Sequence, residues 1–134
     1  MNESSKKEIE PQIENDIPDW IVALFRDIDS MDADAFVKYL IDDAVFVYGS
    51  GSPVTGKENI KDFLGVFYGN LTGILHRITR VWETGETMFV QTRCTYTMKD
   101  GREITIPAIN LFYMEGDLIK DYLIYADPTP MLAA

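Results

Sequence analysis

The chain has 134 residues, of which 46% are apolar and 12% aromatic, so it is long and apolar enough to form one domain with a buried core. Its 12 Lys and Arg stand against 22 Asp and Glu, which gives a formal charge of −10. An acidic surface repels phosphate backbones and anionic lipids, so the composition argues against nucleic acid or a membrane as a partner.

The single cysteine, Cys94, excludes an internal disulfide framework and a multi-cysteine metal site. It lies in a strand-like run, which predicts a small buried apolar residue. No stretch approaches the roughly 18 apolar residues of a membrane span. The first residues lack the apolar core of a signal peptide, so a cytoplasmic location is expected.

The chain divides into an arm, a domain and a tail. Residues 1–15 are polar and without periodicity, which predicts a flexible N-terminal arm. Residues 16–130 are predicted to form a single domain, and 131–134 a short tail. No internal repeat or low-complexity segment occurs.

Two short helices are predicted at the start of the domain. Asn15 or Asp16 can cap the first, with Pro18 in its first turn. Its apolar face comprises Ile17, Trp20, Ile21, Leu24 and Ile28. Ser30 or Asp32 starts the second helix, whose shared face comprises Phe36, Tyr39 and Leu40.

A first strand is predicted at 44–48, and a third helix at 57–68. Thr55 and Glu58 have the Thr-x-x-Glu spacing of a capping box before that helix, and Gly69 suits its C-terminal cap. Its apolar stripe comprises Ile60, Phe63, Leu64 and Phe67. The helical aromatic residues Phe63, Phe67 and Trp20 are interpreted as core.

The rest of the chain has the pattern of long strands joined by hairpin turns. The strands are predicted at 74–83, 87–98, 103–114 and 118–126. Helices followed by such strands predict an α+β domain, with three N-terminal helices packed on a strongly curved antiparallel sheet that forms a cone. Period-two alternation assigns to the inner wall Met88, Val90, Thr92, Cys94, Tyr96 and Met98, and Ile104, Ile106, Ala108, Asn110, Phe112 and Met114.

The opposite, outer face of the sheet is also apolar. It carries Phe89, Ile109, Leu111, Tyr113, Leu123 and Tyr125. A soluble monomer rarely exposes so much apolar surface in one patch, so this face predicts a two-fold homodimer.

The order of these elements resembles the nuclear-transport-factor-two-like superfamily, in its SnoaL-like, ketosteroid-isomerase-like branch. The segments that carry the resemblance are Asp42-Asp43-Ala44-Val45, Val54-Thr55-Gly56-Lys57-Glu58-Asn59-Ile60 and Asp121-Tyr122-Leu123-Ile124-Tyr125-Ala126-Asp127-Pro128. The likeness covers about 17–130 and implies a cystatin-like cone. This fold hosts isomerases, cyclases, dehydratases, epoxide hydrolases and non-enzymatic binders, so the resemblance implies a small-molecule site and leaves the activity open.

Two known mechanisms of this superfamily do not fit the chain. Ketosteroid isomerases have a general-base aspartate at the position of Tyr48, a protonated aspartate at that of Asn110 and an oxyanion tyrosine near Leu24. Limonene-epoxide-hydrolase-like enzymes need an aspartate at about Ile124. The resemblance therefore implies neither of these activities.

Scytalone dehydratase gives a better overlay. The residues at its tyrosine, histidine, aspartate and asparagine positions are Tyr48, His76, Asp29 and Asn110. The chain departs from that enzyme at Ile28, where the enzyme has a second tyrosine, and in the 87–98 strand, which has no histidine. Its substrate is therefore not carried over, but the four polar residues form the candidate catalytic site.

The residues themselves allow two roles for each member of this set. His76, the only histidine, can be a general base near neutral pH or a core histidine satisfied by one hydrogen bond. Asn110 can donate to a substrate carbonyl or bond internally to His76 or Tyr48. Asp29 either orients His76 or, like Ser30, caps the next helix. Tyr48 is a phenolic donor or an aromatic residue at the cavity mouth.

The sequence contains no phosphate-binding glycine loop, metal-ligand spacing or nucleophile elbow, so neither a cofactor nor a metal is expected. The predicted function is proton transfer on a small apolar carbonyl compound by an isomerase, a cyclase or a dehydratase. His76 would move the proton, while Asn110 and Tyr48 stabilise the enolate oxygen. The alternative is a non-catalytic ligand-binding or dimerisation module.

Overall fold

The computed structural model describes residues 17–132. The predicted N-terminal arm and the predicted helix caps Asn15 and Asp16 lie outside these residues. No helix in the described part of the chain is long and apolar enough to span a membrane.

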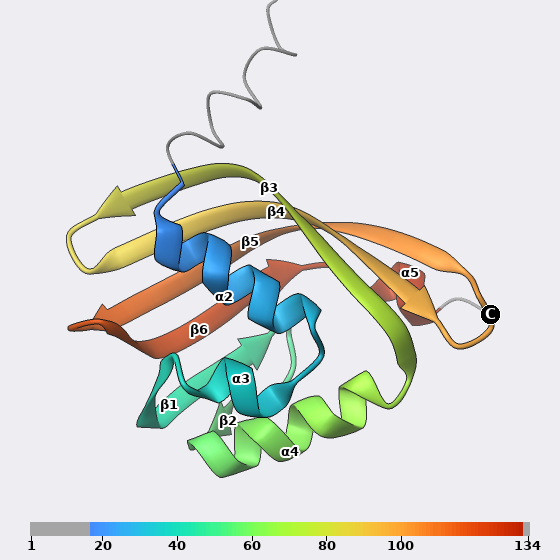
Figure 1. Cartoon of the computed structure of the whole chain (residues 1–134), viewed down its shortest axis with the longest axis horizontal. Helices are drawn as coiled ribbons and strands as arrows, with labels where there is room; N and C mark the ends of the chain where they lie inside the picture. The colour runs from blue at the N-terminus through green and yellow to red at the C-terminus, as the bar shows by residue number, and fades with distance from the viewer. Residues whose placement is uncertain (1–16, 133–134) are drawn as a thin grey trace, which may run out of the picture.

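Helices and strands follow one another as the predicted α+β class requires, and this class is confirmed (Figure 1). The helices are α2 (Asp19–Asp29), α3 (Ala33–Val37), α4 (Lys57–Tyr68) and α5 (Thr129–Leu132). The strands are β1 (Leu40–Tyr48), β2 (Val54–Thr55), β3 (Leu71–Thr84), β4 (Thr87–Met98), β5 (Glu103–Glu115) and β6 (Leu118–Ala126). Because α5 reaches Leu132, the folded part extends beyond the predicted limit at residue 130.

The strands form one curved sheet in the order β2-β1-β6-β5-β4-β3. The four long strands, β3 to β6, pair antiparallel as predicted. The pair β1–β6 is parallel instead, with Phe46 opposite Tyr122. Most of the chain separates these two strands, so no hairpin fixes their relative direction. In this order β3 is an edge strand.

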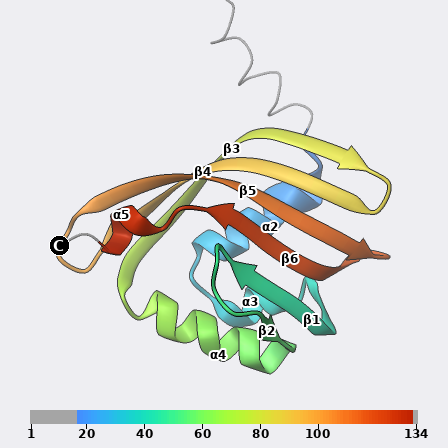
Figure 2. The ribbon, with the colours of Figure 1, turned by 180° about the vertical axis from the view of Figure 1, so that it is seen from behind.

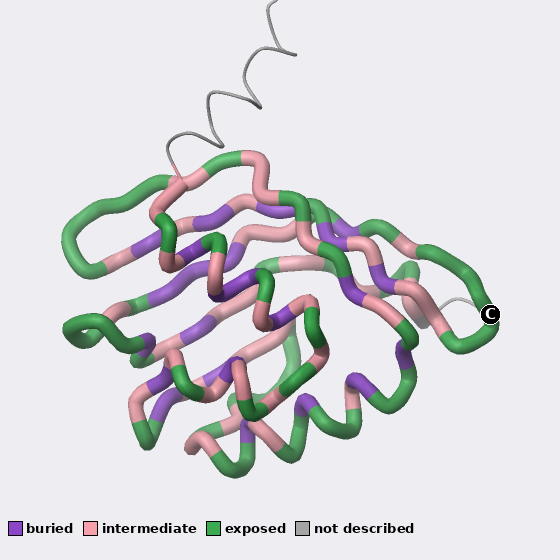
Figure 3. The backbone as a smooth tube through the Cα atoms, in the orientation of Figure 1, coloured by how far each residue is buried: buried purple, intermediate pink, exposed green. Residues whose placement is uncertain are grey.

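Helices α2, α3 and α4 lie on one side of this sheet (Figure 1). The view from behind shows the long strands without a helix laid across them (Figure 2). Buried positions recur along the strands and along the helices, in purple in Figure 3. The inner wall of β4 is confirmed, since Met88, Val90, Thr92, Cys94 and Tyr96 are all buried. Burial raises the pKa of the Cys94 thiol to about 12, so this cysteine is the expected inert core residue.

The start of the second helix agrees with the sequence prediction, and its end differs. Asp32, one of its two predicted starts, is the N-cap of α3, and its carboxylate accepts from the backbone N–H groups of Asp34 and Ala35. Leu40 was expected on that helix but begins β1, where it is buried opposite Ile119.

The predicted capping box before α4 does not form. Thr55 belongs to β2, and the N-cap is Gly56, without a side-chain cap bond. Gly56 has φ of +94°, a conformation that favours glycine and turns the chain from β2 directly into the helix. The helix itself has its predicted limits.

Helix α4 is held to the domain by a narrow apolar stripe, which two substitutions can test. Ile60 is fully buried, whereas Val66 on the same helix is 74% exposed. We expect Ile60→Ala to lower the free energy of unfolding by about 2–5 kcal/mol, because it leaves a cavity in the core. The control Val66→Ala should change it by less than about 0.5 kcal/mol. Urea unfolding followed by circular dichroism measures both, and equal effects would contradict this packing.

Candidate functional site

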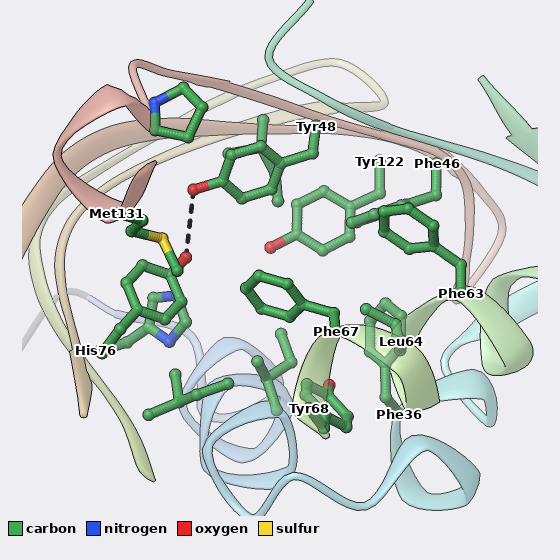
Figure 4. A pocket seen from close by; sticks show the side chains of 15 residues that line it. Phe36, Phe46, Tyr48, Phe63, Leu64, Phe67, Tyr68, His76, Tyr122 and Met131 are labelled. Carbon is green, nitrogen blue, oxygen red and sulfur yellow. Dashed lines mark hydrogen bonds between the residues drawn. The ribbon is translucent and has the colours of Figure 1, made fainter. Parts of the chain in front are cut away.

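A cavity of about 260 Å³ lies between the inner wall of the sheet and helices α2 to α5 (Figure 4). Its aromatic walls are Phe36, Phe46, Tyr48, Phe63, Phe67, Tyr68, Tyr96 and Tyr122. The remaining wall residues are Ile28, Leu64, Ile74, His76, Ile124, Pro128 and Met131. Such a surface suits a small ligand that is mainly apolar.

The helical aromatic residues divide between this cavity and the core. Trp20 packs edge-on against Phe112, as a core residue would. Phe67 also packs against the core, although it lines the cavity as well. Phe63 was interpreted as core too, but it lines the cavity and is 42% exposed. The prediction is therefore corrected for Phe63, whose ring lies against Phe46 on the cavity wall with centroids 5.8 Å apart.

His76 reaches the cavity from the edge strand β3 and is held there by Asp29. The ring atom Nδ1 lies 2.6 Å from Asp29 Oδ1. The backbone N–H of His76 donates to the other carboxylate oxygen, Oδ2, over 2.9 Å. The two side chains are largely buried, 9% exposed for His76 and 17% for Asp29. The predicted contact between Asp29 and the imidazole is therefore confirmed.

This contact fixes which ring nitrogen can act as a base. An ionised carboxylate only accepts hydrogen bonds, so Nδ1 of the neutral ring carries the hydrogen. The lone pair then lies on Nε2, on the side away from Asp29. Phe25 packs beside the ring with its centroid 4.9 Å away, which further limits the orientations of the imidazole. A histidine held this way can accept a proton from a bound molecule.

Tyr48 lines the cavity and is paired with a second tyrosine. Its hydroxyl lies 3.2 Å from that of Tyr96, as the dashed line in Figure 4 marks. One hydroxyl hydrogen lies between the two oxygens, and the second can be donated to another acceptor, either the Cys94 thiol beside Tyr96 or a ligand. Burial raises the pKa of both tyrosines, so both hydroxyls remain protonated at neutral pH.

Asn110 does not line the cavity, contrary to the expectation that it donates to a substrate. It is 1% exposed, and both hydrogens of its amide have acceptors in the core, the Val90 carbonyl and Thr92 Oγ1, each at 3.0 Å. Its Oδ1 accepts from the hydroxyl of Tyr122 over 2.9 Å. The internal bonds expected to His76 or Tyr48 are absent from the bonds of this amide. The register between β4 and β5, which pairs Val90 with Asn110, explains the difference.

Sequence reasoning did not include Tyr96, Tyr122 or Tyr68 among the site residues. The alternation that assigned Tyr96 to the inner wall was a usable signal, and alternation from the outward Leu123 would have turned Tyr122 inward. Tyr68 ends α4 beyond the predicted apolar stripe. Ile124 also lines the cavity, so no carboxylate lies at the position of the epoxide-hydrolase aspartate.

Metal binding has no clear candidate in this part of the chain. Over residues 17–132, no three His, Cys, Asp or Glu side chains are grouped so that they could hold a metal ion.

The described residues form an α+β cone whose hollow is lined by aromatic side chains and by a histidine that a carboxylate holds. Residues 21–122 match the SnoaL-like domain, and the chain belongs to this family. No curated protein sequence matches the chain significantly.

Solved structures share the fold at low sequence identity. A hypothetical protein with a ketosteroid isomerase-like fold from Catenulispora acidiphila, in complex with trimethylamine, has a TM-score of 0.74 at 17% identity, covering 81% of this chain and 85% of that chain. A putative SnoaL-like polyketide cyclase from Jannaschia sp. has a TM-score of 0.74 at 17% identity, covering 98% and 94%. An LEH-like epoxide hydrolase from M. tuberculosis has a TM-score of 0.71 at 18% identity, covering 84% and 83%.

The orientation of His76 can be measured without a ligand. Because the chain has one histidine, long-range ¹H–¹⁵N NMR reports a single imidazole. Above the pH at which the ring loses its charge, we expect the hydrogen on Nδ1. In Asp29→Ala the ring should move toward a mixture of both tautomers. A wild-type ring with its hydrogen mainly on Nε2 would contradict the assigned roles.

Proposed function

We propose that this protein binds a small, largely apolar carbonyl compound in the hollow and transfers a proton on it with His76. The reaction would be that of an isomerase, a cyclase or a dehydratase, without a cofactor. The observation that carries the proposal is the imidazole of His76, which lines an aromatic cavity while Asp29 holds its Nδ1. The complex of the Catenulispora acidiphila protein with trimethylamine supports small-molecule binding.

The proton transfer would begin at Nε2 of His76. This atom takes a proton from the carbon next to the carbonyl group, and the C–H electrons move to the carbonyl oxygen, which becomes an enolate. Asp29 stabilises the imidazolium that forms. The imidazolium then returns the proton to another atom of the substrate or to a leaving hydroxyl group.

The enolate oxygen needs a hydrogen-bond donor in a cavity whose walls are mainly apolar. The pair Tyr48 and Tyr96 would supply it with the hydroxyl hydrogen that their mutual bond does not use, which the enolate oxygen would draw from the weak acceptor Cys94. Asn110 was expected to share this role, but both of its amide hydrogens are bonded within the core. We therefore propose an indirect role for Asn110, through Tyr122.

Proton exchange tests the proposal with simple compounds. We expect the wild-type protein in D₂O to catalyse the loss of α-hydrogen signals from small aromatic ketones such as 2-tetralone, followed by ¹H NMR. His76→Ala should slow this exchange about 10²–10⁴-fold, the usual contribution of a general acid–base group. The control Leu75→Ala removes a neighbouring side chain that is 66% exposed and should leave the rate unchanged. Binding of the ketones without exchange would favour the non-catalytic binding module.

We further propose a homodimer through the outer face of the sheet. Tyr113 and Tyr125 on this face are 41% and 59% exposed. Leu111 is buried between its neighbours Phe89 and Leu123 on the flanking strands, so the exposed apolar surface is smaller than the sequence predicted. The two tyrosines would form the centre of the interface.

Light scattering measures this assembly directly. We expect a mass near twice the 15.3 kDa of one chain at micromolar concentration. Tyr125→Glu should give a monomer, because it places a charge in the proposed interface. Val66→Glu adds the same charge on α4, away from the outer face, and should leave the dimer intact. A wild-type monomer would contradict the proposal.

A further inference from the structure

The hydroxyl of Tyr122 is turned toward the cavity, but its hydrogen is donated to Asn110 in the core. In Figure 4 the hydroxyl points into the space enclosed by the labelled side chains. The same oxygen lies 2.9 Å from Oδ1 of Asn110, which lies behind the wall in the core. The direction of this hydrogen bond decides what Tyr122 can offer to a ligand.

The surroundings of Asn110 fix that direction. The Val90 carbonyl can only accept, so the nitrogen end of the amide must face it, at 3.0 Å. The oxygen end of the amide then faces Tyr122. Because this oxygen can only accept as well, the hydrogen between the two residues belongs to Tyr122. Turning the amide over would place two acceptors together at Val90 and leave a buried amide hydrogen facing the tyrosine.

Tyr122 can therefore present only a lone pair to the cavity. Burial raises the pKa of its hydroxyl well above the usual value, so the group stays neutral. Its hydrogen remains bonded to the tyrosine oxygen and is donated to Asn110 Oδ1. A ligand carbonyl placed here would set one acceptor against another. A ligand O–H or N–H would find a partner in a region where an unmatched polar group is costly.

We propose that Tyr122 determines specificity as a hydrogen-bond acceptor, so that the cavity selects a cyclic, mainly apolar compound with a hydroxyl or N–H donor at this point. Asn110 is the positioning residue that holds Tyr122 in this role. The inference rests on the proposed function in one respect, that the cavity is a ligand site. Together, the two describe a hydroxylated carbonyl compound.

The size of the cavity suggests suitable probes. An apolar cavity of about 150 Å³ binds benzene, and the cavity here has about 260 Å³. Two fused aromatic rings are a reasonable match. 2-Naphthol carries a donor, and 2-fluoronaphthalene has nearly the same shape without one. The ratio of their Kd values isolates the contribution of the donor, because the ring contacts are shared.

Titration calorimetry of both probes against wild type and Tyr122→Phe is the main experiment. We expect the preference for 2-naphthol over 2-fluoronaphthalene to fall about two- to tenfold in Tyr122→Phe, the value of one net hydrogen bond. In His76→Leu, which removes the imidazole as an alternative acceptor, the preference should remain. A fall in His76→Leu alone would overturn the inference, because the donor would then bind the imidazole.

A second variant tests the positioning role of Asn110. Asn110→Leu frees the Tyr122 hydrogen to point into the cavity. We expect its preference for 2-naphthaldehyde, an acceptor, over 2-fluoronaphthalene to rise about two- to tenfold relative to wild type. A residue that only supported the fold would weaken both probes equally, and that result would overturn the positioning role. Tyr122→Phe keeps the inference testable if Asn110→Leu does not fold.

The outcomes separate this inference from the proposed function. If both naphthalene probes bind and Tyr122→Phe leaves their ratio unchanged, the acceptor role of Tyr122 is wrong while the ligand site stands. If neither probe binds the folded wild type at millimolar concentration, the inference and the ligand site fall together.

Discussion

The arrangement of the site depends on one carboxylate that holds two hydrogens of the same residue. Asp29 accepts from both the backbone and the ring of His76. The backbone N–H is available because β3 is an edge strand and this group points away from β4. At the C-terminal end of α2, a carboxylate is opposed by the helix dipole, and the two N–H donors offset that cost. One interaction therefore anchors the strand to the helix and sets the direction of the imidazole.

The other residues of the cavity wall include no second side chain that could act as a base at neutral pH. Its walls are rings and aliphatic side chains, and its polar atoms are mainly tyrosine hydroxyls. Burial raises the pKa of these hydroxyls, so they carry no charge at neutral pH. Hydrogen bonds between Tyr48 and Tyr96, and between Tyr122 and Asn110, satisfy part of their capacity within the protein. What remains for a ligand is a small number of donors and acceptors at fixed places.

The fold and part of the site could be predicted because their signals are local. Period-two alternation assigned Asn110 and Tyr96 to the inner wall, and both are buried there. The resemblance to the superfamily predicted that Asp29 lies beside His76, although 47 positions separate the two residues along the chain. Alternation gives the face of a strand but not the partner across it. The register that sets Asn110 beside Val90 could therefore not be predicted from the sequence. For the same reason, the sequence did not show that the amide hydrogens are bonded in the core and do not reach the cavity.

Whether a polar atom in the cavity is a hydrogen-bond donor or an acceptor strongly affects which ligands a fold of this kind can bind. The structural neighbours share the cone at 17–18% identity, so the fold is retained while most side chains change. In an apolar hollow, exchanging one polar atom changes the set of ligands more than exchanging one ring for another, because an unmatched buried group costs about 1–3 kcal/mol. Asn110 does not line the cavity, but it affects ligand choice. By accepting the hydrogen of the Tyr122 hydroxyl, it leaves only an oxygen lone pair of that group for a ligand. Residues behind the wall are therefore part of the chemical description of the site.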